Sequence, residues 1–122
     1  MKFDLSNRDT IFASLPKGGV GAEIGVDAGI FSEAILRLAN PRLLCLVDSW
    51  AHLPKTTTGS DPANYDQATK DAFYREVYQK FLHDGRVRVL RAFSLDAAQL
   101  FRDSTFDWVF IDANHLQCYQ DI

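Results

Sequence analysis

The sequence predicts an α/β protein built on a parallel sheet, and three observations support this. Apolar runs of strand length alternate with longer stretches of helical period along the chain. Strands that alternate with helices are typical of parallel sheets with right-handed crossovers. The run from Leu43 to Val47 is continuously apolar, as in a strand buried on both faces. The length of 122 residues fits one domain, which we expect to span residues 1–122.

The composition narrows the functional classes. The chain is 47% hydrophobic and carries 13 basic and 16 acidic residues, a formal net charge of -3. No block of basic charge indicates a nucleic-acid or membrane partner. No apolar run approaches the roughly 20 residues of a membrane span, and no apolar signal-peptide core follows the N-terminus. Two cysteines, Cys45 and Cys118, form no disulfide framework, so we expect a reduced, cytoplasmic protein.

The first half of the chain predicts two helices and two strands. A short helix over 6–15 is followed by Pro16 and a glycine turn, and a strand is expected over 20–26. Apolar residues recur at helical spacing over 30–39, and Asn40-Pro41 stops that helix. The apolar run over 43–47 is the second strand.

A long polar stretch over 50–65 separates this half from the next helix, and loops of that length are usually functional or mobile. Helical spacing resumes at Asp66 and continues to Leu82. Gly85 is expected to close this helix in a left-handed conformation.

Two strands and a short helix complete the pattern. Residues 87–90 predict a third strand, and residues 106–111 a fourth and most apolar one. Between them Ser94 is expected to cap a helix that runs through Phe101.

The junction of the first strand and its helix carries the first candidate site. Gly25 and Gly29 stand where a strand turns into a helix, and glycine lets a ligand approach the backbone. The spacing matches neither Gly-x-Gly-x-x-Gly nor a P-loop. Glu23 would repel a pyrophosphate but suits a cationic ligand. The alternative is a tight turn with two structural glycines.

An acidic residue follows the second strand. Asp48 lies about 20 residues beyond the glycine turn, where α/β nucleotide sites bind ribose hydroxyls, although loop capping is the alternative. Trp50 either stacks on a base or packs the loop onto the core. After the third strand, Phe93 and Ser94 would sit beside an adenine, unless Ser94 serves only as a cap.

The fourth strand leads to Asp112 and His115. Ligands of open α/β sheets bind at the carboxyl ends of the strands. Asp112 can bind a cation, orient a substrate or act as a base, and His115 suits proton transfer near neutral pH. Turn capping and an exposed loop histidine are the alternatives. A lone Asp and His predict no metal, although a divalent ion is compatible with this position.

Together these segments resemble the class I S-adenosylmethionine-dependent methyltransferases, in particular the small-molecule O-methyltransferase branch. Members carry Glu-x-Gly-x-x-x-Gly, Asp-Ser/Thr-Trp, Phe-Ser or Asp-Ser, and Ile-Asp-Gly-Asp-His after successive strands. This sequence has Glu-Ile-Gly-Val-Asp-Ala-Gly, Asp-Ser-Trp, Ala-Phe-Ser and Ile-Asp-Ala-Asn-His, in that order. The resemblance implies a Rossmann-like three-layer α/β/α fold with strand order 3-2-1-4.

The resemblance also implies a role for each position. S-adenosylmethionine would be the cofactor and S-adenosylhomocysteine the product. The implied catalytic residues are Asp112 and His115. The implied cofactor-binding residues are Glu23, Gly25, Val26, Asp27, Gly29, Ser32, Asp48, Ser49, Trp50, Phe93, Ser94 and Asp112.

The sequence departs from the family pattern after the fourth strand and in its number of strands. Ala113 and Asn114 replace a frequent Gly-Asp, and the chain supplies four strands of a seven-stranded fold. We therefore expect the cofactor-binding half of a methyltransferase that acts on a small-molecule hydroxyl. A homodimer, with segments exchanged near the fourth strand, would cover its edge. The alternatives are a non-catalytic S-adenosylmethionine-binding module and an NAD- or nucleotide-binding domain.

Overall fold

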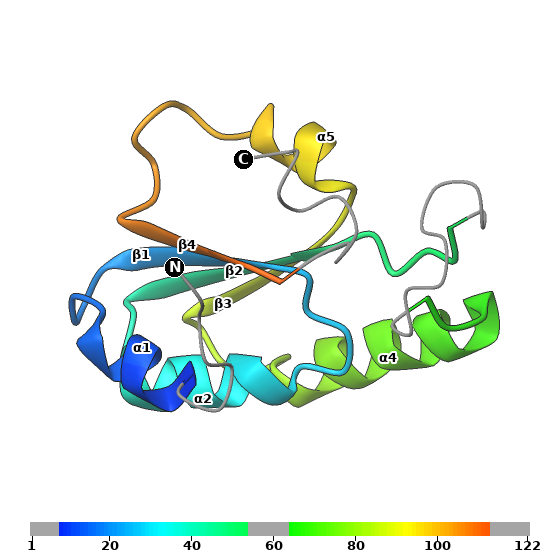
Figure 1. Cartoon of the computed structure of the whole chain (residues 1–122), viewed down its shortest axis with the longest axis horizontal. Coiled ribbons are helices and arrows are strands. Elements are labelled where there is room, and N and C mark those ends of the chain that lie inside the picture. The colour runs from blue at the N-terminus through cyan, green and yellow to red at the C-terminus, as the bar shows by residue number, and fades with distance from the viewer. Residues whose placement is uncertain (1–7, 54–63, 113–122) are drawn as a thin grey trace.

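One parallel four-stranded sheet lies between two layers of helices in the computed structural model, which describes residues 8–53 and 64–112. Figure 1 shows α1, α2 and α4 on one face of the sheet and α5 on the other. The helices are α1 (Arg8–Ser14), α2 (Ile30–Leu38), α4 (Gln67–Lys80) and α5 (Ser94–Ala98). The strands are β1 (Val20–Ile24), β2 (Leu43–Asp48), β3 (Val87–Arg91) and β4 (Trp108–Ile111).

The strand order is β3-β2-β1-β4, and each neighbouring pair is parallel. This confirms the predicted fold class, three-layer arrangement and order. β1 lies at the centre with β2 on one side and β4 on the other, so the winding of the chain reverses at β1. Ligands of such sheets bind outside the carboxyl ends of the strands at this reversal.

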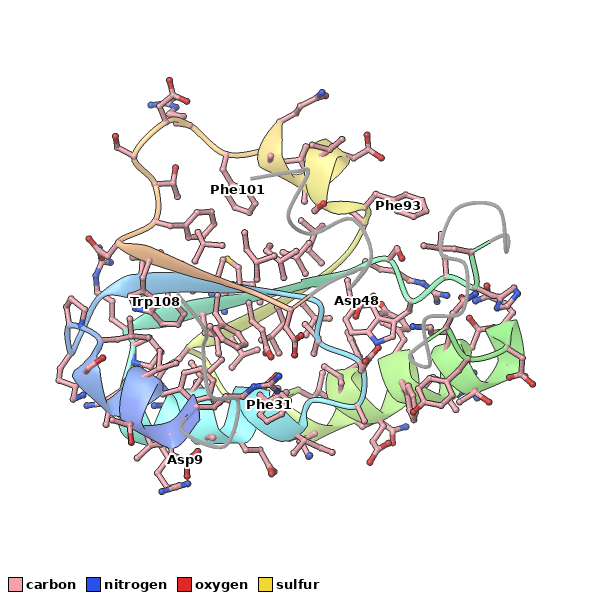
Figure 2. The ribbon with its side chains drawn as sticks, in the orientation of Figure 1. Asp9, Phe31, Asp48, Phe93, Phe101 and Trp108 are labelled. Carbon is pink, nitrogen blue, oxygen red and sulfur yellow. The ribbon has the colours of Figure 1, made fainter. Side chains whose placement is uncertain are left out.

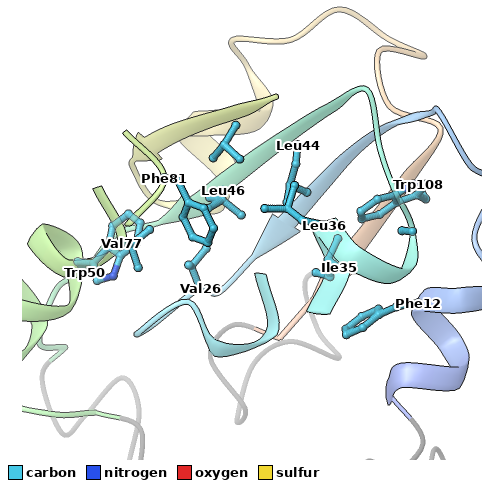
Figure 3. Close-up of a cluster of buried hydrophobic side chains, with 12 residues drawn as sticks. Phe12, Val26, Ile35, Leu36, Leu44, Leu46, Trp50, Val77, Phe81 and Trp108 are labelled. Atoms are coloured by element: carbon cyan, nitrogen blue, oxygen red, sulfur yellow. The ribbon is translucent and has the colours of Figure 1, made fainter. Parts of the chain in front are cut away.

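The core fills the space between the sheet and the three helices on its lower face (Figure 3). β2 contributes Leu44 and Leu46, which lie between side chains from α1, α2 and α4. Gly21 is required on β1, because a Cβ there would lie 2.1 Å from the indole ring of Trp108. The glycine that weakens the strand pattern in the sequence therefore makes room for a core tryptophan.

Helices α4 and α5 differ from the prediction at their ends, and α5 stops at Ala98 rather than at Phe101. Ser94 is the first residue of α5 rather than its cap, and Phe93 occupies the N-cap position without a side-chain hydrogen bond. The helix α4 ends at Lys80, and Gly85 has no positive φ. Two successive tight turns, closed by bonds from Asp84 N to Phe81 O and from Val87 N to Asp84 O, lead into β3 instead.

The upper face of the sheet is less covered than the lower face. Val109 and Ile111 on the edge strand β4 are both exposed, while the short helix α5 buries only Ala97 among its own side chains. None of the helices within the described residues is long and apolar enough to cross a membrane.

Candidate functional site

Four carboxylates converge at the carboxyl edge of the sheet. Glu23 lies near the end of β1, paired in register with Leu46 of β2 and Phe110 of β4. Asp48 ends β2, and Asp112 follows β4. Together with Asp27 from the glycine turn, both act electrostatically on Glu23. The topology therefore gathers acidic groups that are far apart in the sequence.

The glycine turn joins β1 to α2 through three residues in the left-handed region. Gly25 has φ 90°, Asp27 has φ 51° and Gly29 has φ 80°. Only glycine adopts such angles without strain, although aspartate tolerates them better than most residues. At Gly29 the missing Cβ makes room for α4, because a Cβ there would lie 3.1 Å from a methyl group of Val77.

Asp48 fixes the glycine turn and the start of the β2–α4 loop together. Its Oδ2 accepts hydrogen bonds from the backbone N of Val26 at 2.8 Å and of Asp27 at 2.9 Å. Its Oδ1 accepts one from the backbone N of Trp50 at 2.8 Å. An ionised carboxylate has about four acceptor positions, so about one remains for a ligand hydroxyl. Loop capping, one of the two alternatives for Asp48, is thus observed.

Glu23 is fully buried and carries an unsatisfied oxygen. Its Oε1 accepts a hydrogen bond from the hydroxyl of Ser32 at 2.5 Å, which explains why Ser32 faces inward from α2. Its Oε2 has no hydrogen-bond partner within the described part of the chain. Burial raises the pKa of Glu23 to about 8, opposed by the Ser32 bond and reinforced by the three nearby aspartates. The group is therefore mainly neutral at pH 7.

Trp50 is buried and Phe93 is exposed at this edge of the sheet. Trp50 is fully buried, donates from Nε1 to the carbonyl of Asp27 at 2.9 Å, and packs against Tyr74 at 5.0 Å between ring centroids. Of the two roles predicted for Trp50, it therefore has the one of packing the loop onto the core. Phe93 is 51% exposed and follows Ala92, whose N donates to the carbonyl of Asp48 at 2.9 Å. Figure 2 shows Phe93 and Asp48 toward the same edge.

Lys70 is a site residue that the sequence did not reveal. Its ammonium lies 3.3 Å from Oδ1 of Asp27, with 9% of the lysine side chain exposed. Burial raises the pKa of Asp27, although the Lys70 charge opposes this rise. No local pattern distinguishes Lys70 from the other charged residues of α4, because its partner lies in a distant turn.

Arg8 is the second such residue. Its Nη1 lies 3.4 Å from Oδ2 of Asp112, and its guanidinium lies 3.9 Å from the centroid of the Phe31 ring. Asp112 is anchored by its own N–H, which donates to the carbonyl of Ile24 at 2.7 Å. The ion pair joins two ends of the chain, so the sequence pattern could not show it.

The remaining predicted residues have simpler placements. Val26 is buried in the core, and its N–H reaches Asp48. The hydroxyl of Ser49 accepts a bond from the backbone N of Ala51 at 3.3 Å. His115 lies outside the described residues. Within the described ranges, no three His, Cys, Asp or Glu side chains are placed to hold a metal ion.

Comparison with known families identifies the class. Residues 22–121 match the family described as the methyltransferase domain, and the chain therefore belongs to that family. No curated protein matches the chain in sequence.

Solved structures share the fold at low sequence identity. A dimethyladenosine transferase from Plasmodium falciparum has a TM-score of 0.57 and 14% identity, over 93% of this chain and 33% of that one. Spermidine synthase from Thermotoga maritima has a TM-score of 0.52 and 17% identity, over 84% of this chain and 30% of that one. The PRMT1 enzyme–prozyme complex of Trypanosoma brucei with AdoHcy has a TM-score of 0.51 and 20% identity, over 86% of this chain and 26% of that one. The chain therefore spans a third or less of the length of these three structures.

Proposed function

We propose that this chain binds S-adenosylmethionine at the carboxyl ends of β1 and β2 and takes part in methyl transfer to a small-molecule hydroxyl. One observation carries the proposal: Glu23 is a buried acid beside the glycine turn, at the point where the winding reverses, and one of its oxygens has no partner among residues 8–53 and 64–112. Membership of the methyltransferase-domain family supports the reaction class.

The residues present fit such a cofactor. Oε2 of Glu23 suits the positive amino or sulfonium end, because a buried acid is stabilised as its anion by a neighbouring cation. Asp48 has about one free acceptor position for a ribose hydroxyl. Phe93 offers an exposed ring for the adenine, and its neighbour Ala92 bonds to the carbonyl of Asp48. Gly25 lacks a Cβ and has φ 90° at the start of the glycine turn, where the amino-acid end would approach the backbone.

The bound cofactor would supply an activated methyl group on its sulfonium. The protein then has to hold the acceptor close and aligned, and correct alignment alone removes a large part of the barrier. We assign Asp112 to orient the acceptor and His115 to take the hydroxyl proton. His115→Ala should leave cofactor affinity unchanged and slow turnover at least about tenfold. Equal turnover rates would remove His115 from the mechanism.

A binding module without turnover is the second candidate. The chain covers a third or less of each of the three solved structures named above. In this case the cofactor site would be present and the acceptor pocket would be supplied elsewhere. A second copy is one source, because Val109 and Ile111 leave apolar side chains exposed on the edge strand β4. We propose a homodimer on this ground, and a monomeric mass by light scattering would contradict it.

Calorimetry separates these candidates. Titration with S-adenosylmethionine, S-adenosylhomocysteine and NAD should show binding of the first two alone. A turnover assay with catechols, phenols and sugars then distinguishes the enzyme from the binding module. Binding of NAD without affinity for either sulfur nucleoside would contradict the proposed site.

A further inference from the structure

Arg8 is a largely buried guanidinium with unmade hydrogen bonds. Its side chain is 13% exposed, and its Nε is buried without a hydrogen-bond partner within the described residues. The contact from Nη1 to Asp112 is 3.4 Å long, whereas charge-assisted bonds between nitrogen and oxygen are about 2.7–2.9 Å. Arginine presents five N–H donors, and leaving buried donors unsatisfied is costly. The guanidinium therefore has capacity for a further acceptor.

The position of Arg8 places this capacity beside the acidic site. Asp112 pairs with Arg8 and also raises the pKa of Glu23, so the guanidinium and the buried acid lie near one carboxylate. The ring below Arg8 belongs to Phe31, two residues beyond Gly29 at the end of the glycine turn. Cationic and anionic groups thus lie near the same part of the turn.

We propose that Arg8 binds the α-carboxylate of the cofactor's amino-acid end. This inference rests on the proposed function. An amino acid is a zwitterion, so its site requires an anion for the ammonium and a cation for the carboxylate. The acids around Glu23 supply the first, and Arg8 supplies the second. Its planar fork matches a carboxylate in a bidentate geometry.

A specificity follows from this assignment. A nucleoside that keeps the ammonium but lacks the carboxylate would leave Arg8 without its partner. The site would therefore favour a cofactor that carries the carboxylate over its decarboxylated analogue. The competing explanation is that Arg8 only docks α1 onto the sheet, through Phe31 and Asp112. Such a structural role would affect all ligands equally.

The test compares two ligands on matched variants. Arg8→Met keeps a long apolar stem over Phe31 and removes the charge. Arg42→Met removes the same charge at the exposed residue before β2, at the opposite edge of the sheet. The ligands are S-adenosylhomocysteine and S-adenosyl-3-thiopropylamine, which differ only in the carboxylate. Affinities from calorimetry form a double cycle of residue and carboxylate.

We expect Arg8→Met to weaken S-adenosylhomocysteine at least about tenfold and to leave the decarboxylated analogue within about twofold. Arg42→Met should change neither. An equal loss for both ligands, or no loss, would overturn the role of Arg8. If Arg8→Met does not fold, the two ligands are compared on the native protein alone. The decarboxylated analogue should then bind at least about tenfold more weakly than S-adenosylhomocysteine, and equal affinities would overturn the assignment. Native protein that binds neither ligand contradicts the proposed function itself.

Discussion

The hydroxyl of Ser32 donates to Oε1 of Glu23 at 2.5 Å inside the protein, joining α2 to β1. Both side chains are fully buried, so water cannot replace this bond. The bond favours the ionised acid, yet burial outweighs it and raises the pKa of Glu23 to about 8. The protein therefore keeps a protonated acid at the site where we place a cationic ligand.

Stability should depend on pH through Glu23. The folded pKa is about 8 and the ordinary value is 4.5, so between these pH values the folded state holds a proton that the unfolded state releases. The free energy of unfolding should fall as pH rises through this window, by up to about 1.4 kcal/mol per pH unit, and level off above it. Denaturant unfolding from pH 4 to 9 measures this slope.

Glu23→Gln is the matched variant, because it keeps the shape and does not titrate. As pH rises through this window, the native protein should lose unfolding free energy relative to Glu23→Gln. Parallel curves across the whole window would show that Glu23 has an ordinary pKa.

Asp48→Ala should reduce both stability and cofactor affinity. It removes the acceptor for three backbone N–H groups, and we expect a loss of at least about 2 kcal/mol in unfolding free energy. At temperatures where the variant is still folded, its affinity for S-adenosylhomocysteine should be at least about tenfold lower than that of the native protein. Asp107→Ala is the control, since Asp107 accepts from the backbone N of Val20 at 2.7 Å at the opposite end of β1. It should lose stability and keep affinity; unchanged affinity in Asp48→Ala would remove that residue from the site.

Gly25→Val should abolish cofactor binding while the fold survives. A side chain at φ 90° is strained by about 1–2 kcal/mol and would project beside the ligand. Gly18→Val shares the strain at φ 75°, but a Cβ there meets nothing within 4 Å, and Gly18 lies at the far end of β1. Similar melting temperatures with loss of binding only in Gly25→Val support the site. Loss of binding in both would indicate a general effect of destabilisation.

Phe93→Ala should weaken binding through loss of stacking on the adenine. Aromatic contact with a base contributes about 1–3 kcal/mol, so we expect roughly a tenfold loss or more in affinity for S-adenosylhomocysteine. Stability should change little, because Phe93 is 51% exposed. Leu95→Ala, at 67% exposure on α5, removes a comparable apolar side chain and should have no effect. Equal affinities of Phe93→Ala and Leu95→Ala would show that the adenine does not stack on Phe93.

Local patterns predicted most of the fold. Each strand and helix carries its own periodicity, and alternation of the two implies a parallel sheet, so the element order follows without knowledge of tertiary contacts. The end of α4 was missed, because Phe81 enters the core and the chain leaves through tight turns rather than a left-handed glycine.

The candidate site was predictable only where one segment carries the chemistry. Glu23 lies one residue before the end of β1 and Asp48 ends β2, so their meeting at one edge follows from the topology. Whether Trp50 packs on the core or stacks on a base was not predictable from the sequence. The direction of its side chain depends on the loop conformation, in which Trp50 has φ 46°. Arg8 and Lys70 were missed because each contacts a residue in another element, and a single sequence carries no record of such pairs.

The most direct test is a crystal structure grown with S-adenosylhomocysteine, accompanied by calorimetry in the same buffer. We predict nucleoside density across the carboxyl ends of β1 and β2, with the amino-acid end near Glu23 and a ribose hydroxyl on Asp48. An empty edge, with no heat of binding in solution, would contradict the central claim.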